Sequence, residues 1–133
     1  MIYLLDVNAL VALGFMNHEF HARVAAWIRS RNSPQLASCP ITELGFVRVL
    51  AQAPAYRFTV AQARTLLLRL KEGRTSRLTF LSDEHDVSLL PGWVRAPKQI
   101  TDGHLSKLAS AKGAVLATLD ESIPGSYLIP KYR

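Results

Sequence analysis

Short apolar runs alternate with stretches of helical periodicity along the chain, and this alternation limits the folds that the chain can adopt. The run Ile2–Leu5 is apolar throughout and is followed by Asp6, as is typical of a strand buried on both faces of a parallel sheet. Further strand candidates lie at Gln35–Ser38, residues 78–81, Ala114–Thr118 and, as an edge strand, residues 127–129. Because parallel neighbours need crossover helices, we expect an α/β fold with a mainly parallel central sheet.

Helical stretches separate these strand candidates. One begins at Pro40, a residue favoured in the first turn of a helix, and stops before Pro54. Another has Thr59 as its N-cap and is followed by Gly73. The expected helices span residues 7–15, 18–31, 40–53, 59–72 and 101–112, the last opening at a capping residue, and residues 83–99 are expected to form a short helix and a loop.

The composition is that of an ordinary globular protein, with 133 residues of which 49% are hydrophobic and 20% are charged. We expect one domain over residues 1–133, large enough to bury a core. The single cysteine, Cys39, cannot form a disulfide within the chain, and no cluster of cysteine and histidine suggests zinc. No basic segment precedes the first apolar run, and the longest apolar stretch, residues 9–16, is too short to cross a bilayer. These features predict a cytoplasmic protein without a membrane segment.

Four acidic residues lie at the ends of the predicted elements. Asp6 follows the first strand, and Glu43 lies in the first turn of the helix after the second strand. Asp102 opens the last helix, and Asp120 lies just beyond the strand Ala114–Thr118. Ligands of open α/β sheets gather at the carboxyl ends of the strands, so we expect these four carboxylates to meet there.

Each acid also has a structural explanation when it is considered alone. Asp6 and Asp102 could be stabilised by helix N-termini, and Asp120 could be a turn residue. Glu43 is harder to explain in this way, because Phe46 at i+3 places it beside the apolar face of its helix. Burying a lone carboxylate would be energetically costly. We therefore interpret the four acids together, as one candidate site.

A group of four carboxylates needs a compensating positive charge. Such side chains repel one another and cannot all stay ionised unless a cation, such as a divalent metal ion, lies among them. Ligands that are all oxygen favour Mg²⁺ or Mn²⁺ over zinc. These ions activate a bound water and stabilise the oxygens of a phosphodiester, so the group predicts hydrolysis of a nucleic-acid backbone.

The overall charge favours a polyanionic partner. Sixteen Lys and Arg against ten Asp and Glu give a net charge of +6. Setting aside the four site acids leaves an excess of ten positive charges elsewhere, so a negative pocket would lie within a positive field. The candidates for contact with phosphates are Arg23, Arg29, Arg31, Arg69, Lys71, Arg74, Arg77, Arg95 and Lys98.

The segments around the four acids resemble the motifs of PIN-domain ribonucleases, and among them the VapC-type toxins of toxin–antitoxin pairs. The family pattern of strand, Asp, any residue and small polar residue is similar to residues 4–8, Leu-Leu-Asp-Val-Asn. A Thr-Glu pair near a helix start is similar to residues 40–44, Pro-Ile-Thr-Glu-Leu. Residues 100–105, Ile-Thr-Asp-Gly-His-Leu, and residues 117–120, Ala-Thr-Leu-Asp, resemble the third and fourth motifs. The order and spacing of the motifs carry the resemblance, which extends over nearly the whole chain.

The resemblance implies a PIN fold, a three-layer α/β/α sandwich, and an endoribonuclease that depends on Mg²⁺ or Mn²⁺. It implies cleavage of tRNA, rRNA or mRNA by a metal-activated water, a homodimer, and inhibition by a cognate antitoxin. The implied metal-binding and catalytic residues are Asp6, Glu43, Asp102 and Asp120, with Asn8 and Thr118 as auxiliary groups. Glu121 competes with Asp120 for the fourth position, and the Thr-x-Asp pattern favours Asp120.

Other interpretations stay open at this point. The chain could be a catalytically silent PIN-fold module that binds RNA or another protein. No histidine is clearly placed as a general base: His104 is expected at the surface or in packing, and His18 and His21 at an exposed helix entry. Trp93 could stack on an RNA base, but we expect it to cover the core or a dimer interface. A dinucleotide or P-loop site is disfavoured, because neither glycine motif is present to cradle the phosphates.

Overall fold

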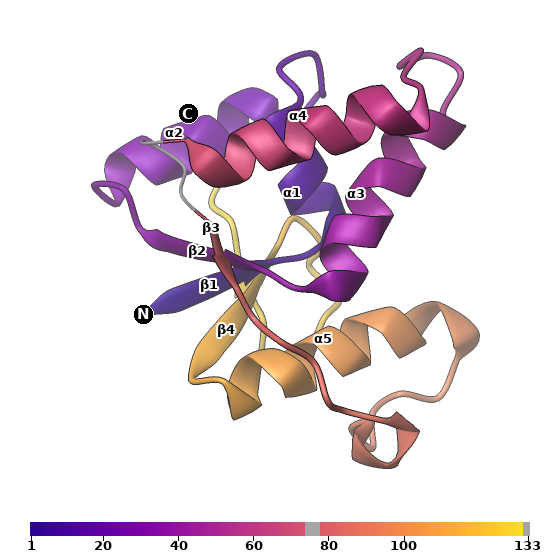
Figure 1. Ribbon diagram of the computed structural model, residues 1–133. Coiled ribbons are helices and arrows are strands. Elements are labelled where there is room, and N and C mark those ends of the chain that lie inside the picture. The colour runs from indigo at the N-terminus through magenta and orange to yellow at the C-terminus, as the bar shows by residue number, and fades with distance from the viewer. Residues whose placement is uncertain (74–77, 132–133) are drawn as a thin grey trace.

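The computed structural model describes residues 1–73 and 78–131, and strands and helices alternate along it (Figure 1). Arg74 and Arg77, two of the candidates for phosphate contact, lie outside the described residues. The strands are β1 (Ile2–Leu5), β2 (Gln35–Ser38), β3 (Leu78–Phe80), β4 (Ala114–Thr118) and β5 (Tyr127–Leu128). The α-helices are α1 (Val7–Gly14), α2 (His21–Ser30), α3 (Pro40–Gln52), α4 (Val60–Glu72) and α5 (Ile100–Ala111).

The five strands form one sheet in the order β3-β2-β1-β4-β5. Every neighbouring pair is parallel, so the prediction of a mainly parallel sheet in an α/β fold is confirmed. The register aligns Leu5 of β1 with Ala117 of β4, and Leu4 with Ala37 of β2. All five strands therefore end at the same edge, and β1 and β4 lie side by side at its centre.

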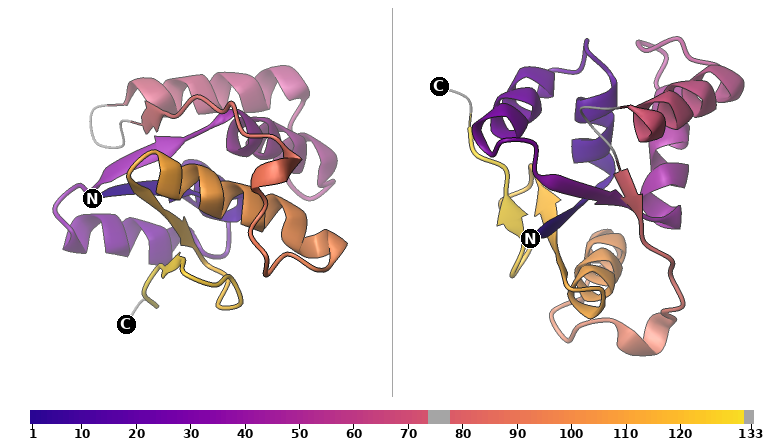
Figure 2. Two further views of the ribbon diagram at one scale, coloured as in Figure 1. Left: turned by 90° about the horizontal axis from the view of Figure 1, so that it is seen from below. Right: turned by 60° about the vertical axis from the view of Figure 1, so that its left-hand side comes forward.

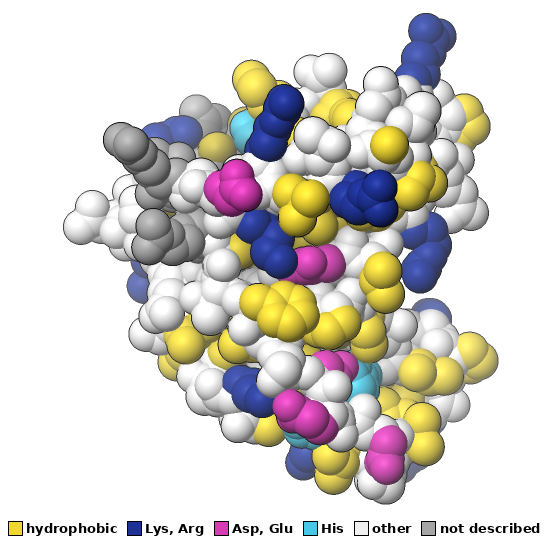
Figure 3. All heavy atoms as spheres, viewed as in Figure 1, with side chains coloured by type: hydrophobic (Ala, Val, Ile, Leu, Met, Phe, Trp, Pro, Cys, Tyr) yellow, Lys and Arg dark blue, Asp and Glu magenta, His cyan; other side chains and the backbone are white. Residues whose placement is uncertain are grey.

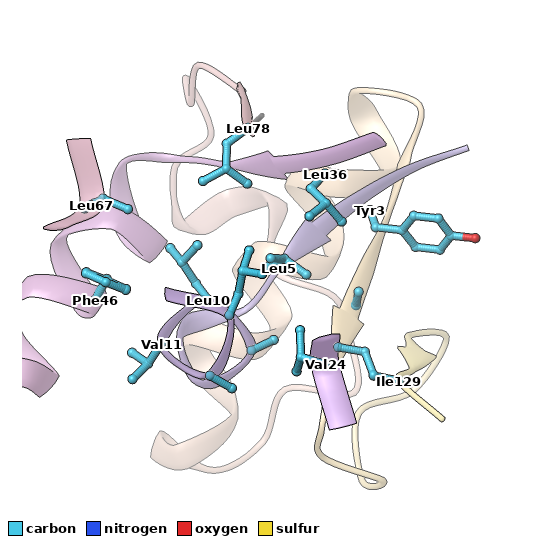
Figure 4. Close-up of a cluster of buried hydrophobic side chains, with 14 of the residues drawn as sticks. Tyr3, Leu5, Leu10, Val11, Val24, Leu36, Phe46, Leu67, Leu78 and Ile129 are labelled. Atoms are coloured by element: carbon cyan, nitrogen blue, oxygen red, sulfur yellow. The ribbon is translucent and has the colours of Figure 1, made fainter. Parts of the chain in front are cut away.

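Helices cover both faces of the sheet. Helices α1 to α4 lie on one face and α5 lies on the other, as the views in Figures 1 and 2 agree. Side chains of a strand alternate between the faces, so Leu5 belongs to the core under α1 to α4 and Leu4 to the core under α5. Figure 4 shows the larger core, a cluster that includes Phe46 and Leu67 from the helices and Leu36 from β2. The three-layer arrangement is confirmed.

Most helix boundaries agree with the predictions to within a residue or two, and two starts differ. Helix α2 begins at His21 rather than at His18, and residues 18–20 form a turn before it. Helix α5 begins at Ile100, and its N-cap residue Gln99 makes no side-chain capping bond, so the prediction of a capping residue there was wrong. Thr59 does cap α4, where its hydroxyl accepts from the Gln62 backbone N–H at 3.0 Å.

The segment between β3 and α5 contains two short 3-10 helices, Val87–Leu89 and Pro97–Gln99, rather than one helix and a loop. Trp93 packs against the smaller core, in agreement with a covering role. Among the described helices, none combines the length and the apolar character needed to cross a membrane.

Candidate active site

Asp6 lies at the carboxyl end of the central strand β1, and its carboxylate is fixed by two hydrogen bonds. The Oδ1 atom accepts from the Ala9 backbone N–H at 2.9 Å, which makes Asp6 the N-cap of α1. The Oδ2 atom accepts from the Thr118 hydroxyl at 2.5 Å. Only 7% of Asp6 is exposed and Thr118 is fully buried. The parallel pairing of β1 with β4 thus brings together two residues that are far apart in the sequence.

Asp102 and Asp120 lie close enough to Asp6 for the three charges to interact. Burial raises the pKa of Asp6, and the charges of Asp102 and Asp120 raise it further. Burial also raises the pKa of Asp102, with Asp120 again adding to the effect. The structure therefore brings three of the four predicted acids into one electrostatic group, in which the ionised form of Asp6 is disfavoured.

Asp120 is the member of this group that ionises most easily. The backbone N–H and then the hydroxyl of Ser122 hold its pKa below the ordinary value of 3.8, and Lys98 contributes in the same direction. Both donors reach the Oδ1 atom, at 2.8 Å and 2.7 Å. The Asp120 backbone N–H donates to the Thr118 hydroxyl oxygen at 3.0 Å, so the same threonine positions both acids.

A pocket of about 310 Å³ opens beside these side chains. One part of its wall consists of predicted site residues, namely Asp6, Asn8 and Asp120. The remainder is lined by His18, Glu19, Phe20 and Leu119. The sequence analysis did not predict that residues 18–20 belong to the site. Phe20 continues the apolar spacing of the following helix, so these residues were expected to be helical rather than to form a turn.

Glu43 occupies a separate position, in the first turn of α3. Its Oε2 atom lies 2.7 Å from the Lys71 ammonium of α4 and accepts from the Ser38 hydroxyl at 2.7 Å. The Lys71 nitrogen also lies 5.0 Å from the centre of the Phe80 ring. Glu43 is not among the residues that line the acidic pocket. In this conformation its carboxylate is paired with a lysine and does not belong to the group around Asp6.

The auxiliary and alternative residues can also be placed. Asn8 is exposed at the rim of the pocket, in α1. Glu121 is largely exposed, points to Lys131 at 3.9 Å, and is not among the pocket residues. The pocket thus contains Asp120 rather than Glu121 as the acid that follows β4.

Several of the basic candidates have partners within the protein. Arg23 donates to the carbonyl oxygen of Ile129, and Arg31 donates to the Tyr127 hydroxyl. On the face shown in Figure 3, the Lys and Arg side chains are scattered among acids and apolar groups rather than gathered in one stripe. Of the candidates within the described residues, Lys71 pairs with Glu43, and Lys98 acts electrostatically on Asp120.

His104 makes a strong local contact outside the pocket. Its Nε2 atom lies 2.6 Å from Asp83 Oδ2, and both side chains are mostly buried. The interpretation of His104 as a packing residue agrees with this contact.

The donor set around Asp6 suits a divalent cation in its chemistry. A buried carboxylate is held next to two more carboxylates, and within residues 1–73 and 78–131 no basic group contributes to the shift in the pKa of Asp6. In the described part of the chain, however, no three Asp, Glu, His or Cys side chains converge closely enough to enclose an ion. Mg²⁺ typically binds through one or two carboxylates and keeps several waters, so a loose carboxylate group fits it better than a closed cage would.

Comparisons with known proteins agree with this fold. No protein-family model matches the chain. Among curated proteins, the chain is 39% identical over 127 residues to Ribonuclease VapC38 of Mycobacterium tuberculosis, covering 90% of this chain and 86% of that protein. It is 33% identical over 132 residues to Ribonuclease VapC39 of the same species, covering 95% and 94%.

Solved structures with the same arrangement include VapBC2 from Rickettsia felis bound to a DNA fragment from its promoter, with a TM-score of 0.61, 17% identity, and coverage of 96% of this chain and 97% of that chain. M. tuberculosis VapC20, described as a toxin that cleaves the sarcin–ricin loop, has a TM-score of 0.62, 11% identity, and coverage of 98% and 99%. The all-parallel sheet with helices on both faces is thus the fold of the PIN-domain class. Within that class, the chain belongs to the VapC ribonuclease family.

Proposed function

We propose that the protein is a metal-dependent endoribonuclease, the toxin of a toxin–antitoxin pair, whose active site is built on Asp6, Asp102 and Asp120. The observation that carries this proposal is the burial of Asp6 beside two further carboxylates at the carboxyl edge of the sheet. Membership of the VapC ribonuclease family supports RNA as the substrate.

The contacts of each side chain indicate its role in the proposed reaction. Asp6, Asp102 and Asp120 would hold Mg²⁺ or Mn²⁺, which supplies an activated water and stabilises charge on a phosphodiester. Thr118 orients Asp6 through its hydroxyl and receives the backbone N–H of Asp120, so it keeps the two carboxylates in register. Asn8 stands at the pocket rim, where its amide can meet substrate or solvent.

Glu43 is the fourth proposed ligand, and it reaches the site only by leaving Lys71. The ion pair is partly exposed, with 25% and 19% of the two side chains accessible, and exposed pairs contribute about 0 to 1 kcal/mol. A cation in the acidic pocket can overcome an interaction of that size. Lys71 would then be released toward the phosphate backbone.

A cognate antitoxin and a second copy of the chain are the proposed protein partners. Structure neighbours from Rickettsia felis and Salmonella typhimurium are VapBC complexes, which supports an antitoxin. Leu44 and Val60 are 64% and 60% exposed and line a shallow hollow of about 560 Å³ between α3 and α4. Exposed apolar side chains of this kind mark surfaces for protein partners.

A catalytically silent module is the second candidate, and one observation favours it. Glu43, a residue expected to bind metal, is already neutralised by Lys71. A protein that has lost its metal would keep the fold and could keep its partners.

RNA cleavage by the purified protein separates the two candidates. With millimolar Mg²⁺ we expect cleavage that EDTA stops. Asp6→Asn should lower the rate about a hundred-fold or more, because Asp6 would hold the metal ion whose charge stabilises the transition state. Glu72→Gln is the matched control, because Glu72 is an exposed acid at the end of α4. Equal rates for the parent and Asp6→Asn would contradict the proposed function.

A further inference from the structure

The acidic pocket has a second wall whose chemistry differs from that of the first. Asp6 and Asp120 supply carboxylates on one side, whereas the turn before α2 supplies His18, Glu19 and Phe20. Among the described residues, His18 and Glu19 do not converge with the acids into a group that could enclose a metal ion. Two aromatic rings and a carboxylate are, however, the groups that proteins use to bind an unstacked nucleobase.

The turn has a defined conformation. The Phe20 backbone N–H donates to Nδ1 of His18 at 3.0 Å, and the two ring centres lie 5.8 Å apart at an angle of 45°. Because Nδ1 accepts this bond, the neutral imidazole carries its proton on Nε2. Burial lowers the pKa of His18, which favours this neutral form. The histidine is therefore fixed as an uncharged aromatic ring with one donor.

The ring of Phe20 contacts Arg23 but is not buried. Its side chain is 38% exposed. The guanidinium carbon of Arg23 lies 5.9 Å from the centre of its ring, and that guanidinium is fixed by the carbonyl oxygens of Ile129 and Pro130. Through Arg23, the Phe20 ring is thus held by residues that follow β5. It still lines the pocket, which suits a stacking surface rather than a core residue.

We propose that His18, Glu19 and Phe20 form a binding site for an unpaired nucleobase next to the phosphodiester that is cleaved, and that this site favours guanine. The inference rests on the proposed function, since it names the part of an RNA substrate that the pocket takes. The base would stack on the exposed Phe20 ring, with the tilted His18 ring beside it, and its Watson–Crick edge would donate to Glu19.

Guanine is favoured because of the donors along its edge. A carboxylate has only acceptors, arranged for two parallel hydrogen bonds. Guanine offers the adjacent N1–H and N2–H₂ donors, whereas adenine and cytosine place an acceptor beside their amino group and uracil places its one N–H between two carbonyl oxygens. The pocket volume of about 310 Å³ lies at the small end of ligand sites, in keeping with one nucleotide rather than a duplex.

Titration with mononucleotides tests the site without any need for catalysis. In millimolar Mg²⁺, GMP, AMP, CMP, UMP and inorganic phosphate are added in turn to the full-length protein labelled with ¹⁵N, and the backbone resonances are followed by NMR. We expect GMP to shift the resonances of residues 18–20 and to bind at least about ten-fold more tightly than UMP, because two hydrogen bonds to a charged group distinguish them. Equal affinities for all four nucleotides, or GMP shifts confined to other residues, would overturn the proposal.

Two variants assign the roles within the turn. Glu19→Gln should abolish the preference for GMP, and Phe20→Leu should weaken all four nucleotides, because stacking tolerates any base. Glu72→Gln and Met16→Ala are the controls: the first removes an exposed acid elsewhere, and the second truncates a 79% exposed side chain just before the turn. A preference for GMP that survives in Glu19→Gln would contradict the role of the carboxylate.

The result can be separated from the fate of the proposed function. If the parent cleaves RNA but GMP leaves residues 18–20 unchanged, the nucleobase site is wrong and the nuclease stands. If GMP binds at residues 18–20 but the parent does not cleave RNA in Mg²⁺, the nucleobase site stands and the nuclease is wrong.

Discussion

The ionised carboxylate of Asp6 lowers the stability of the folded protein. It is 7% exposed and lies near two other acids, so its pKa is raised in the folded state, above the ordinary value of 3.8. The folded protein therefore binds a proton at Asp6 more tightly than the unfolded chain does. The resulting penalty is absent below pH 3.8 and grows as the pH rises through the folded-state pKa.

Asp6→Asn should consequently stabilise the metal-free protein. Asparagine is an equally good N-cap and its side-chain oxygen can still accept from the Ala9 backbone N–H. In EDTA at pH 7 we expect the variant to unfold a few degrees above the parent in thermal denaturation, with the difference disappearing in acid. A variant less stable than the parent at pH 7 would show that the buried charge is compensated in a way that the contacts do not reveal.

The ion pair between Glu43 and Lys71 leads to a second prediction, about the affinity for metal ions. If Lys71 competes with a metal ion for the Glu43 carboxylate, Lys71→Met should bind Mn²⁺ about two- to five-fold more tightly, as expected for a partly exposed pair. Calorimetry measures this affinity without any RNA. Arg69→Met, which removes an exposed charge from the same helix, should leave it unchanged. The same affinity in Lys71→Met and the parent would mean that Glu43 takes no part in metal binding.

At the scale of the element, the strands could be predicted from the sequence and the contacts between distant elements could not. A continuous apolar run such as Ile2–Leu5 leaves few alternatives to a buried strand. The bond from Thr118 to Asp6, by contrast, depends on β1 lying next to β4, which no local pattern specifies. The contact of Lys71 with Glu43 similarly depends on how α4 packs on α3.

The turn before α2 shows a different limit of the sequence. Phe20, Val24 and Ile28 have helical spacing, and the helix nonetheless starts only at His21. Phe20 is the N-cap and makes no side-chain capping bond, so the usual signal for a helix start is missing. Because the helical spacing of apolar residues extends beyond the helix itself, the sequence does not indicate that these residues form a turn beside the pocket.

Helix α5 packs closely against the preceding segment at Gly103, and substitution of this glycine tests that packing. A Cβ atom at this position would lie 2.2 Å from Val94 Cγ2 and 3.3 Å from Pro91 Cδ, so Gly103→Ala must push these residues away from the helix that carries Asp102. We expect the free energy of unfolding to fall by about 1 to 3 kcal/mol in urea denaturation. At Gly92 a Cβ atom meets nothing within 4 Å, so Gly92→Ala should be close to neutral. Equal stabilities of the two variants would contradict the close approach.

At the scale of the whole molecule, charge and topology act together. The parallel sheet brings residues separated by more than a hundred positions to one edge, where Asp6 and Asp120 share a pocket. The chain as a whole carries a net charge of +6 around this negative site. An excess of positive charge attracts RNA from any direction, whereas the acidic pocket repels phosphate until a cation is present. A metal ion would therefore act as the link between the substrate and the protein.

The central claim is that the carboxylates around Asp6 form a divalent-metal site, and calorimetric titration with Mn²⁺ tests it most directly. We predict that the parent and Glu72→Gln bind Mn²⁺ at millimolar concentration or below, and that Asp6→Asn weakens binding by at least about ten-fold while remaining folded. Absence of binding by the parent, or equal binding by Asp6→Asn, would contradict this account.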